Sequence, residues 1–425
     1  MLTTEHTWFK RRGYLHFDLP ISFKQAESIV KNPAKVQRHA FYPFILNTIK
    51  SKKIQKDKRT GVLHSSIKER PVQYASHVDS HIYSYYAHIL STQYEETIKK
   101  LGIDDSVLAF RKLGKSNIDY ANNAFNEIIK RQECSAVALD IEGFFDNLNH
   151  AILKQAWGKV IKYTRLPNDH YSVFKSLTKF SRVEKDSAYK EFNISKYNPK
   201  NNNNRICEPE YFRSRVRGSG LITINKKDFG IPQGSPISAL LSNIYMLDFD
   251  LKIVNLMRTL NGCYYRYCDD ILLILPLNYK NEIIEVVIKE VNQLKLNINN
   301  NKTKFRDFIV VNGQLKSKKP LQYLGFTFDG QHKLIRSAAF SRYSECMKSG
   351  VRLAKLTRIK YNRVRIQKGQ PIQNVYRNKI YERYSHLGQR NFVRYGYRSS
   401  DVMSSNAIKK QLKPLWNKLN EEIKK

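Results

Sequence analysis

The sequence is poor in acidic residues and in cysteine, and it lacks long apolar runs. Asp and Glu account for 37 of its 425 residues, against 74 Lys and Arg, so the formal net charge is +37. The five cysteines have no zinc-binding spacing, which favours reduced intracellular thiols over a metal site. The N-terminal stretch has no apolar signal core, and no run approaches membrane-spanning length. These absences predict a cytoplasmic protein with no membrane partner.

The basic surplus predicts a polyanionic partner. Nucleic acid is the leading candidate, because Lys and Arg release counterions from phosphates. The abundant Tyr and Phe, 26 and 21 residues, suit base stacking. From residue 351 onward, 19 Lys or Arg stand against 4 Asp or Glu, and the helical pattern there is typical of a cradle for a duplex. The alternative is a solvated basic surface with no ligand.

Hydrophobic periodicity predicts a mixture of helices and strands. Residues 1–60 are basic and broken, ending in a loop or a strand-to-strand turn. Within 67–90 the helical spacing runs through Ile82, Tyr85, Tyr86 and Ile89, and further helices are predicted over 117–131, 145–180, 238–257 and 280–296. An extended segment surrounds Pro71, a buried strand covers 135–141, and hairpins cover 216–230, 263–275 and 321–330. The Asn-rich segment 193–204 is predicted to be a surface loop.

Three aspartates lie at predicted strand ends. Asp140 closes a buried strand, while Asp269 and Asp270 occupy the turn of a hairpin. Crowded carboxylates are costly unless they are paired or bound to a metal. Carboxylates on adjacent strands could hold two Mg²⁺ ions about 3.5–4 Å apart, with substrate phosphates completing the ligands. Taken alone, two aspartates at a turn are commonly only a turn.

The motifs around these aspartates resemble those of reverse transcriptases, in the same order. The palm motifs are matched by DIEGFFDNLNH (140–150), GIPQGSPIS (230–238) and YCDD (267–270), followed by KTK (302–304) and LQYLGF (321–326). Upstream, KERPV (68–72) and FRKLGKSNIDYA (110–121) resemble fingers segments. The resemblance covers roughly residues 60–330.

The resemblance implies an α+β right-hand polymerase, with fingers, an antiparallel-sheet palm backed by helices, and a helical thumb. The expected boundaries are 1–134 for the N-terminal extension and fingers, 135–330 for the palm with a fingers insertion at about 151–229, and 331–425 for the basic thumb.

The resemblance also assigns the metal ligands. Asp140 and Asp269 would be the principal ligands, Asp270 would complete the acidic cluster, and Ile141 would add its backbone carbonyl. Two Mg²⁺ ions are implied, with Mn²⁺ as a possible substitute.

Around this centre the resemblance implies a nucleotide site. Phe145 corresponds to the aromatic gate that excludes a ribose 2′-hydroxyl; the alternative is a core Phe, as expected for adjacent Phe144. The predicted nucleotide-binding residues are Lys68, Arg70, Arg111, Phe145, Pro232, Gln233, Gly234 and Lys302. For the basic residues among them, the alternative is generic surface charge or, for Lys302, simple screening.

A further set is expected to contact primer and template: Tyr267, Cys268, Leu324, Gly325, Arg358, Lys360, Arg363 and Arg365. Cys268 stands where related intron and retron enzymes commonly have Ala, and little loss of activity is expected from this difference.

The C-terminal stretch 391–423 resembles bacterial defence-associated reverse transcriptases of the unknown group. That resemblance implies a noncoding RNA template encoded beside the gene, dNTP substrates, and a cDNA product that acts in antiphage defence. The alternatives are a retron-like or group II intron-like enzyme, untemplated or protein-primed DNA synthesis, an RNA-dependent RNA polymerase, and a non-catalytic RNA-binding scaffold. The sequence does not indicate an oligomeric state.

Overall fold

A five-stranded antiparallel sheet carries the predicted aspartates in the computed structural model, which describes residues 7–56, 60–201 and 203–425. Its strands, in spatial order, are β6 (Cys263–Tyr267), β7 (Asp270–Leu275), β3 (Cys134–Asp140), β8 (Lys304–Val311) and β9 (Gln314–Ser317). Strands β3 and β7 are nearly continuous apolar runs, as expected for inner strands of a sheet that is covered on both faces.

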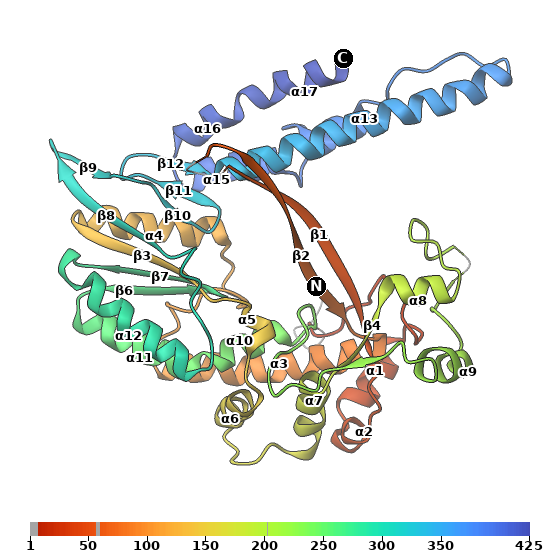
Figure 1. The fold of residues 1–425 in the computed structure, drawn as a ribbon, viewed down its shortest axis with the longest axis horizontal. Coiled ribbons are helices and arrows are strands. Elements are labelled where there is room, and N and C mark those ends of the chain that lie inside the picture. The colour runs from red at the N-terminus through yellow and green to blue at the C-terminus, as the bar shows by residue number, and fades with distance from the viewer. Residues whose placement is uncertain (1–6, 57–59, 202) are drawn as a thin grey trace.

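Side chains of the central strands alternate between two hydrophobic cores. Val137 and Leu139 point into one core, which α3 (His77–Lys100), α11 (Leu247–Thr259) and α12 (Lys280–Gln293) also line. Cys134 and Ala136 point into the other, with α4 (Asn117–Arg131) and the C-terminal elements. Figure 1 shows α4 on one side of the sheet and α11 and α12 on the other. By the same alternation, Asp140 and Asp270 lie on the α4 side.

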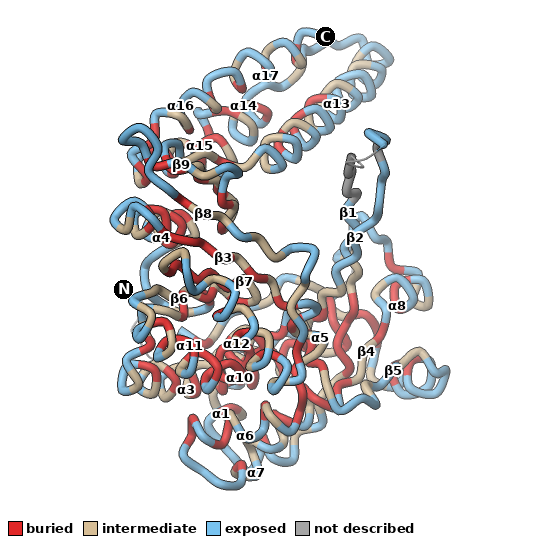
Figure 2. The backbone as a smooth tube through the Cα atoms, turned by 60° about the vertical axis from the view of Figure 1, so that its left-hand side comes forward, coloured by how far each residue is buried: buried red, intermediate tan, exposed pale blue. Residues whose placement is uncertain are grey.

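A second sheet holds a long hairpin, in the spatial order β2 (Leu63–Tyr74), β1 (Phe44–Lys56), β4 (Ser181–Glu184) and β5 (Thr223–Ile224). The β1–β2 pair is antiparallel, whereas β1 and β4 are parallel. Figure 2 shows this hairpin standing clear of the C-terminal helices, with the outer part of β2 exposed. A third hydrophobic cluster packs at the base of the hairpin.

Short helices surround these two sheets. They are α1 (Phe23–Val30), α2 (Pro33–Gln37), α5 (Phe144–Asn147), α6 (His150–Ile161), α7 (Asn168–Thr178), α8 (Lys185–Glu191), α9 (Pro209–Tyr211), a π-helix η2 (Phe212–Arg217), α10 (Ser238–Tyr245) and a 3₁₀ turn η3 (Leu277–Tyr279). No helix among the described residues combines the length and the apolarity needed to span a membrane.

The C-terminal part consists of a small sheet and a group of helices. The sheet contains β10 (Leu321–Tyr323), β11 (Phe326–Phe328) and β12 (Lys333–Ile335). The helices are α13 (Ser337–Gln367), α14 (Asn378–Tyr384), α15 (Phe392–Val402), α16 (Asn406–Leu412) and α17 (Pro414–Lys424). Helix α13 buries residues only in its first half, at Tyr343, Met347 and Val351, and its second half projects beyond the other helices (Figure 1).

Most of the predicted elements are confirmed. The helix at 117–131, the strand at 135–141, the hairpins at 263–275 and 321–330, and the extended-then-helical segment around Pro71 all form. The helix at 280–296 forms as α12, and the α+β fold class is confirmed. The segment 193–204 has no helix or strand among its described residues, although Ile194 is buried. The predicted turn near residue 60 falls partly on residues outside the described ranges.

One predicted element is wrong, and another is interrupted. The segment 216–230 is not a hairpin: it begins in η2, and Thr223–Ile224 pairs with β4 instead, where Ile224 stands opposite Ser181. The reason is that Leu221 and Ile222 pack against the third cluster rather than against a neighbouring strand of their own. The helix expected at 238–257 is interrupted at Met246, whose N–H bonds to the carbonyl of Asn243, three residues back.

Candidate active site

Strand register brings two of the predicted aspartates face to face. Asp140, the last residue of β3, is the register partner of Asp270, the first residue of β7. Asp269 lies in the turn between β6 and β7, and its carbonyl accepts a 3.1 Å hydrogen bond from the N–H of Ile141. The hairpin and the end of β3 therefore gather all three acids at one edge of the sheet, as the sequence predicted.

The turn before these acids has an uncommon backbone. Cys268 adopts a left-handed conformation with φ of 61°, although it is not glycine, and its side chain is buried. Such a conformation costs about 1 kcal/mol and persists only where the surroundings impose it. The residue beneath the turn supplies that constraint.

Arg266 is fully buried and binds Asp250 through two hydrogen bonds, of 2.7 and 2.5 Å. Its remaining terminal nitrogen donates to the carbonyl of Cys268 at 3.2 Å and to the side chain of Asn243 at 3.1 Å. Tyr264 donates a further 2.5 Å hydrogen bond to Asp250. The turn therefore rests on a buried ion pair that binds helices α10 and α11 to strand β6.

The sequence reasoning missed this ion pair. A signal was present, because Arg266 interrupts a strand pattern that is otherwise apolar or aromatic, and Asp250 lies in the mostly apolar helix MLDFDLKIV. A charge placed in a buried pattern needs an opposite charge nearby. Nothing in the sequence identified which charge would supply it.

Electrostatics at the aspartates indicate a need for cations. Burial, together with the negative charges of Asp269 and Asp140, raises the pKa of Asp270 to about 6, while Lys302 and Arg336 oppose the shift. Lys302 Nζ lies 2.5 Å from Asp140 Oδ1 and is half exposed. An ammonium group thus already serves as a counterion to the cluster.

The donor set fits magnesium. No group of three or more acidic, His or Cys side chains among the described residues is gathered tightly enough to hold an ion by itself. Mg²⁺ is, however, commonly bound by one or two carboxylates, with waters and substrate phosphates as the other ligands. Asp140 and Asp270 supply such a pair of oxygen donors, and the mutual repulsion that raises the pKa of Asp270 is what a bound cation relieves.

Phe145 lies on α5, the short helix that follows β3, five residues after Asp140. Its side chain is half-buried, whereas that of Phe144 is 4% exposed and belongs to the core, as the sequence predicted. The carbonyl of Phe145 accepts a 2.9 Å hydrogen bond from the N–H of Ile231, the residue before Pro232. The gate candidate is thereby connected directly to the turn formed by Pro232, Gln233 and Gly234.

That turn is pressed against strand β2. The carbonyl of Gln233 accepts a 2.8 Å hydrogen bond from the N–H of Gln73. Gly234 has a φ of 115°, and a Cβ there would lie 2.6 Å from the Gln73 carbonyl and 3.1 Å from Val72 Cγ1. Only glycine allows this approach. The side chain of Val72 therefore faces the turn.

Strand periodicity then orients two of the predicted triphosphate contacts. Arg70 and Lys68 are two and four residues from Val72, so they lie on the same face of β2, about 7 and 13 Å further along the strand. Both are exposed. Glu69 lies on the opposite face and forms a 2.9 Å ion pair with Lys50.

The contacts of Arg111 disagree with its predicted role in nucleotide binding. Its side chain is 2% exposed and forms a two-pronged ion pair with Glu95, with hydrogen bonds of 2.8 and 2.7 Å. Its other terminal nitrogen donates to the carbonyls of Asp104 and Val107. With these donors engaged, Arg111 holds a loop in place and does not face a nucleotide.

The predicted primer and template contacts fall into two groups. Tyr267 adjoins the aspartates, and the β10–β11 turn at Leu324 and Gly325 is held by hydrogen bonds from Asn117 to Leu324 and from the N–H of Arg336 to Gly325, of 3.0 and 3.1 Å. The second group lies on the projecting half of α13, where Arg358 is about 33 Å along the helix from Arg336. The structure does not bring Arg358, Lys360, Arg363 and Arg365 to the aspartates.

Comparisons with known proteins agree with the fold. Residues 68–328, more than half of the chain, match the family described as reverse transcriptase (RNA-dependent DNA polymerase). No curated protein matches the chain.

Among solved structures, similar chains include three telomerases. They are apo telomerase from Candida tropicalis (TM-score 0.43, 11% identity, 73% of this chain and 54% of that one), the same enzyme truncated from its C-terminal domain (0.41, 12%, 67% and 55%), and telomerase from Candida albicans with a TWJ fragment of telomeric RNA (0.40, 11%, 78% and 54%). The chain spans about half the length of these structures.

Proposed function

The chain belongs to the reverse transcriptase family, and from that membership we propose that it is an RNA-directed DNA polymerase that extends a primer with deoxynucleotides. The observation that carries this proposal is the register pairing of Asp140 with Asp270, next to Asp269, with the half-buried Phe145 five residues after Asp140. An intact cluster of acids favours catalysis over the scaffold alternative, because idle crowded carboxylates would only add repulsion.

The acids would hold two Mg²⁺ ions, or Mn²⁺ in their place, with Asp140 and Asp269 as principal ligands and the Ile141 carbonyl as a further donor. When bound, such ions activate the primer 3′-hydroxyl and neutralise the charge of the triphosphate and the departing pyrophosphate. The 3′-oxygen attacks the α-phosphorus, and the bond to the pyrophosphate oxygen breaks.

The other residues bind and orient the substrates. Arg70 and Lys68 would hold the triphosphate from β2, and Lys302, which is already beside Asp140, would stabilise or protonate the pyrophosphate. Phe145 would exclude a ribose 2′-hydroxyl because its ring offers neither space nor a hydrogen-bond partner. Pro232, Gln233 and Gly234 would adjoin the templating pair, while Tyr267, Cys268, Leu324 and Gly325 would support the primer end.

We further propose that the template is a noncoding RNA, that the enzyme acts in the cytoplasm, and that its cDNA product contributes to antiphage defence. The resemblance of residues 391–423 to defence-associated reverse transcriptases supports this assignment. The competing proposals are retron-like or intron-like synthesis on another RNA, and untemplated or protein-primed synthesis.

The test is to purify the chain from a bacterial host and to sequence its bound RNA and DNA, beside an Asp269→Ala, Asp270→Ala variant. A structured RNA with complementary DNA that is absent from the variant is expected. DNA without a template match would replace this proposal with untemplated synthesis. Bound RNA without DNA in either protein would favour the alternative of a non-catalytic RNA-binding scaffold.

A further inference from the structure

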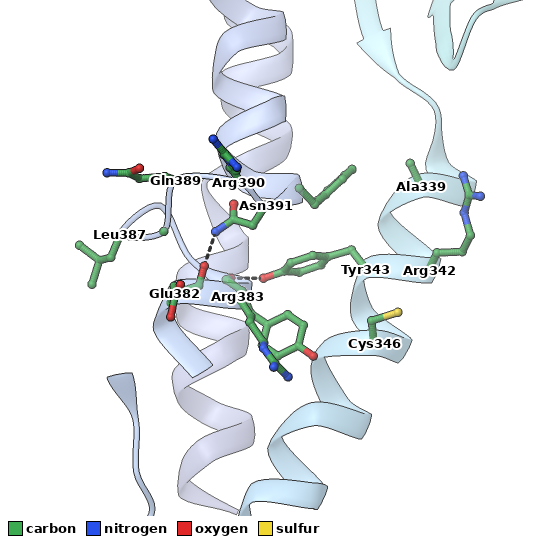
Figure 3. Close-up of a pocket in the computed structure, with 13 residues that line it drawn as sticks. Ala339, Arg342, Tyr343, Cys346, Glu382, Arg383, Leu387, Gln389, Arg390 and Asn391 are labelled. Carbon is green, nitrogen blue, oxygen red and sulfur yellow. Dashed lines mark hydrogen bonds between the residues drawn. The ribbon is translucent and has the colours of Figure 1, made fainter. Parts of the chain in front are cut away.

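A pocket of about 870 Å³ lies in the thumb, away from the aspartates. It is bounded by α13, by the end of α14 and by the segment 385–391 that leads into α15. Figure 3 shows Tyr343 reaching from α13 toward α14, with Arg383, Leu387 and Arg390 across from it. All of its lining residues lie beyond residues 68–328, so the family match assigns this pocket no role.

The pocket favours an anionic group. Arg342, Arg383 and Arg390 line it, and Glu382 is the one acidic residue among its lining residues. Within the described part of the chain, none of the ion pairs formed by arginine involves any of these three residues, and Arg342 bonds only a carbonyl of its own helix. Arg presents a planar set of donors that matches phosphate oxygens.

The same pocket contains aromatic rings. Tyr343 lies 5.2 Å from Phe392 and 6.4 Å from Tyr384, measured between ring centroids. Tyr384 and Phe392 are only half-buried, so part of each ring faces the pocket or solvent. Partly exposed aromatic rings beside arginines without ion pairs form a combination that can bind a nucleotide, with the base stacked and the phosphate paired.

Hydrogen bonds between residues that line the pocket hold its walls in place. Tyr343 donates a 2.5 Å hydrogen bond to the carbonyl of Tyr384. The side chain of Asn391 donates to the carbonyls of Glu382 and Ser385, at 2.8 and 2.7 Å, and also caps α15. At Gly388 a Cβ would lie 1.7 Å from the Glu382 carbonyl, so the segment folds this closely only with glycine. A ligand would therefore meet a site that is already formed.

The pocket lies along α13, the helix that begins beside the β10–β11 turn. The N–H of Arg336, just before α13, is bonded to Gly325 in the β10–β11 turn, and the charge of Arg336 acts on Asp270. The lining residues of α13 follow between about 5 and 15 Å further along the helix, from Ala339 to Cys346. An RNA strand held at the aspartates could thus reach the pocket without crossing the molecule.

We propose that this pocket binds one unpaired nucleotide of the RNA partner, with its phosphate on the arginines and its base against Tyr384 and Phe392. The identity of the partner as RNA rests on the proposed function. The pocket would anchor the RNA outside the duplex being extended, because a base inside a duplex cannot stack on a protein ring.

The first test compares binding of a short fluorescein-labelled oligouridylate to the full chain, an Arg383→Ala, Arg390→Ala variant, and a Lys410→Ala, Lys418→Ala control. The control removes the same charge from exposed positions of the thumb outside the pocket. We expect the pocket variant to bind about tenfold more weakly, and its salt slope to fall by about 0.7 for each phosphate that is no longer neutralised. The control should change little. Equal weakening in both variants would overturn the proposal.

A second measurement locates the binding site. An oligouridylate that carries 5-iodouridine should crosslink to peptides from residues 339–346 or 382–392 in the wild-type chain and in the Asp269→Ala, Asp270→Ala variant. Crosslinks found only elsewhere would overturn the proposal. Failure of DNA synthesis would show separately in primer extension, so the two proposals can fail independently.

Discussion

Arg266 holds both the carboxylate of Asp250 and the carbonyl of Cys268, so one buried guanidinium links the helix layer to the turn that carries Asp269. The charge of Asp250 raises the pKa of Arg266 despite complete burial, so the guanidinium stays charged. We regard Arg266 as a positioning residue, since it acts on the aspartates through the backbone.

Replacing Arg266 by Met should lower the free energy of unfolding by about 3–5 kcal/mol, because Asp250 is left as an uncompensated buried charge. Replacing the pair together, as Arg266→Met with Asp250→Leu, should restore most of that stability in urea unfolding. The double variant should still have a reduced kcat with little change in the KM for dNTP, because the Cys268 carbonyl no longer has its donor. Full recovery of kcat would show that the ion pair serves stability alone.

Gly234→Ala should impair nucleotide incorporation far more than Gly220→Ala. Both glycines have positive φ, so both variants carry backbone strain, but only at Gly234 does a Cβ approach another atom, the Gln73 carbonyl at 2.6 Å. Separating the turn from β2 should reduce kcat/KM for dNTP by tenfold or more, which corresponds to an increase of about 1.4 kcal/mol in the activation free energy. Similar kinetics for the two variants would mean that this close approach is not needed.

Phe145→Ala should admit ribonucleotides. Removing the half-buried ring opens room for a 2′-hydroxyl, and the preference for dNTP over rNTP should fall by roughly 10- to 100-fold in single-nucleotide extension. Phe144→Leu is the matched control, because Phe144 is a core residue whose replacement should affect stability and leave sugar selection intact. If selectivity survives in Phe145→Ala, the ring is not the gate.

Arg70→Ala should raise the KM for dNTP by about tenfold, as expected when a charge-assisted hydrogen bond to a phosphate is removed. Lys50→Ala removes the same charge from the same hairpin but from the opposite face, where Lys50 pairs with Glu69. Steady-state extension should therefore distinguish them. A comparable rise in KM for both variants would reduce the role of Arg70 to general surface charge.

Neutralising Arg358, Lys360, Arg363 and Arg365 together should weaken RNA binding and flatten its dependence on salt, without changing kcat at saturating template. These residues lie on the projecting half of α13, far along the helix from the aspartates. Anisotropy titrations at several salt concentrations provide the measurement, and an unchanged slope would exclude this half of the helix as a nucleic-acid surface.

Local pattern was sufficient to predict the elements that carry the aspartates. The apolar run before Asp140 and the two apolar arms around Asp269 and Asp270 have one stable arrangement, as paired strands with acids at the end. The same logic failed at 216–230, where apolar Leu221 and Ile222 are explained by a cluster that only the folded chain assembles. Pattern cannot distinguish contacts within a segment from contacts to a distant one.

Side-chain partners were harder to predict than elements. Arg111 has a side chain suited to binding phosphate, yet it forms an ion pair with Glu95, which lies sixteen residues upstream on α3. The partnership of Arg266 with Asp250 and the approach of Gln73 to Gly234 likewise depend on distances set by tertiary packing. The sequence identified the chemical groups, and the packing decided which of them are available.

The distribution of side chains between two cores fixes the register in which the strands of the central sheet can pair. A slip of one residue between β3 and β7 would send Asp140 to the opposite face, into the core that α3, α11 and α12 line, and would move Leu139 to the face where the acids now lie. A carboxylate in that apolar layer has no partner, so the slipped form would be unstable as well as inactive. Correctly folded molecules should therefore be active, and a preparation should lose its activity and its structure together.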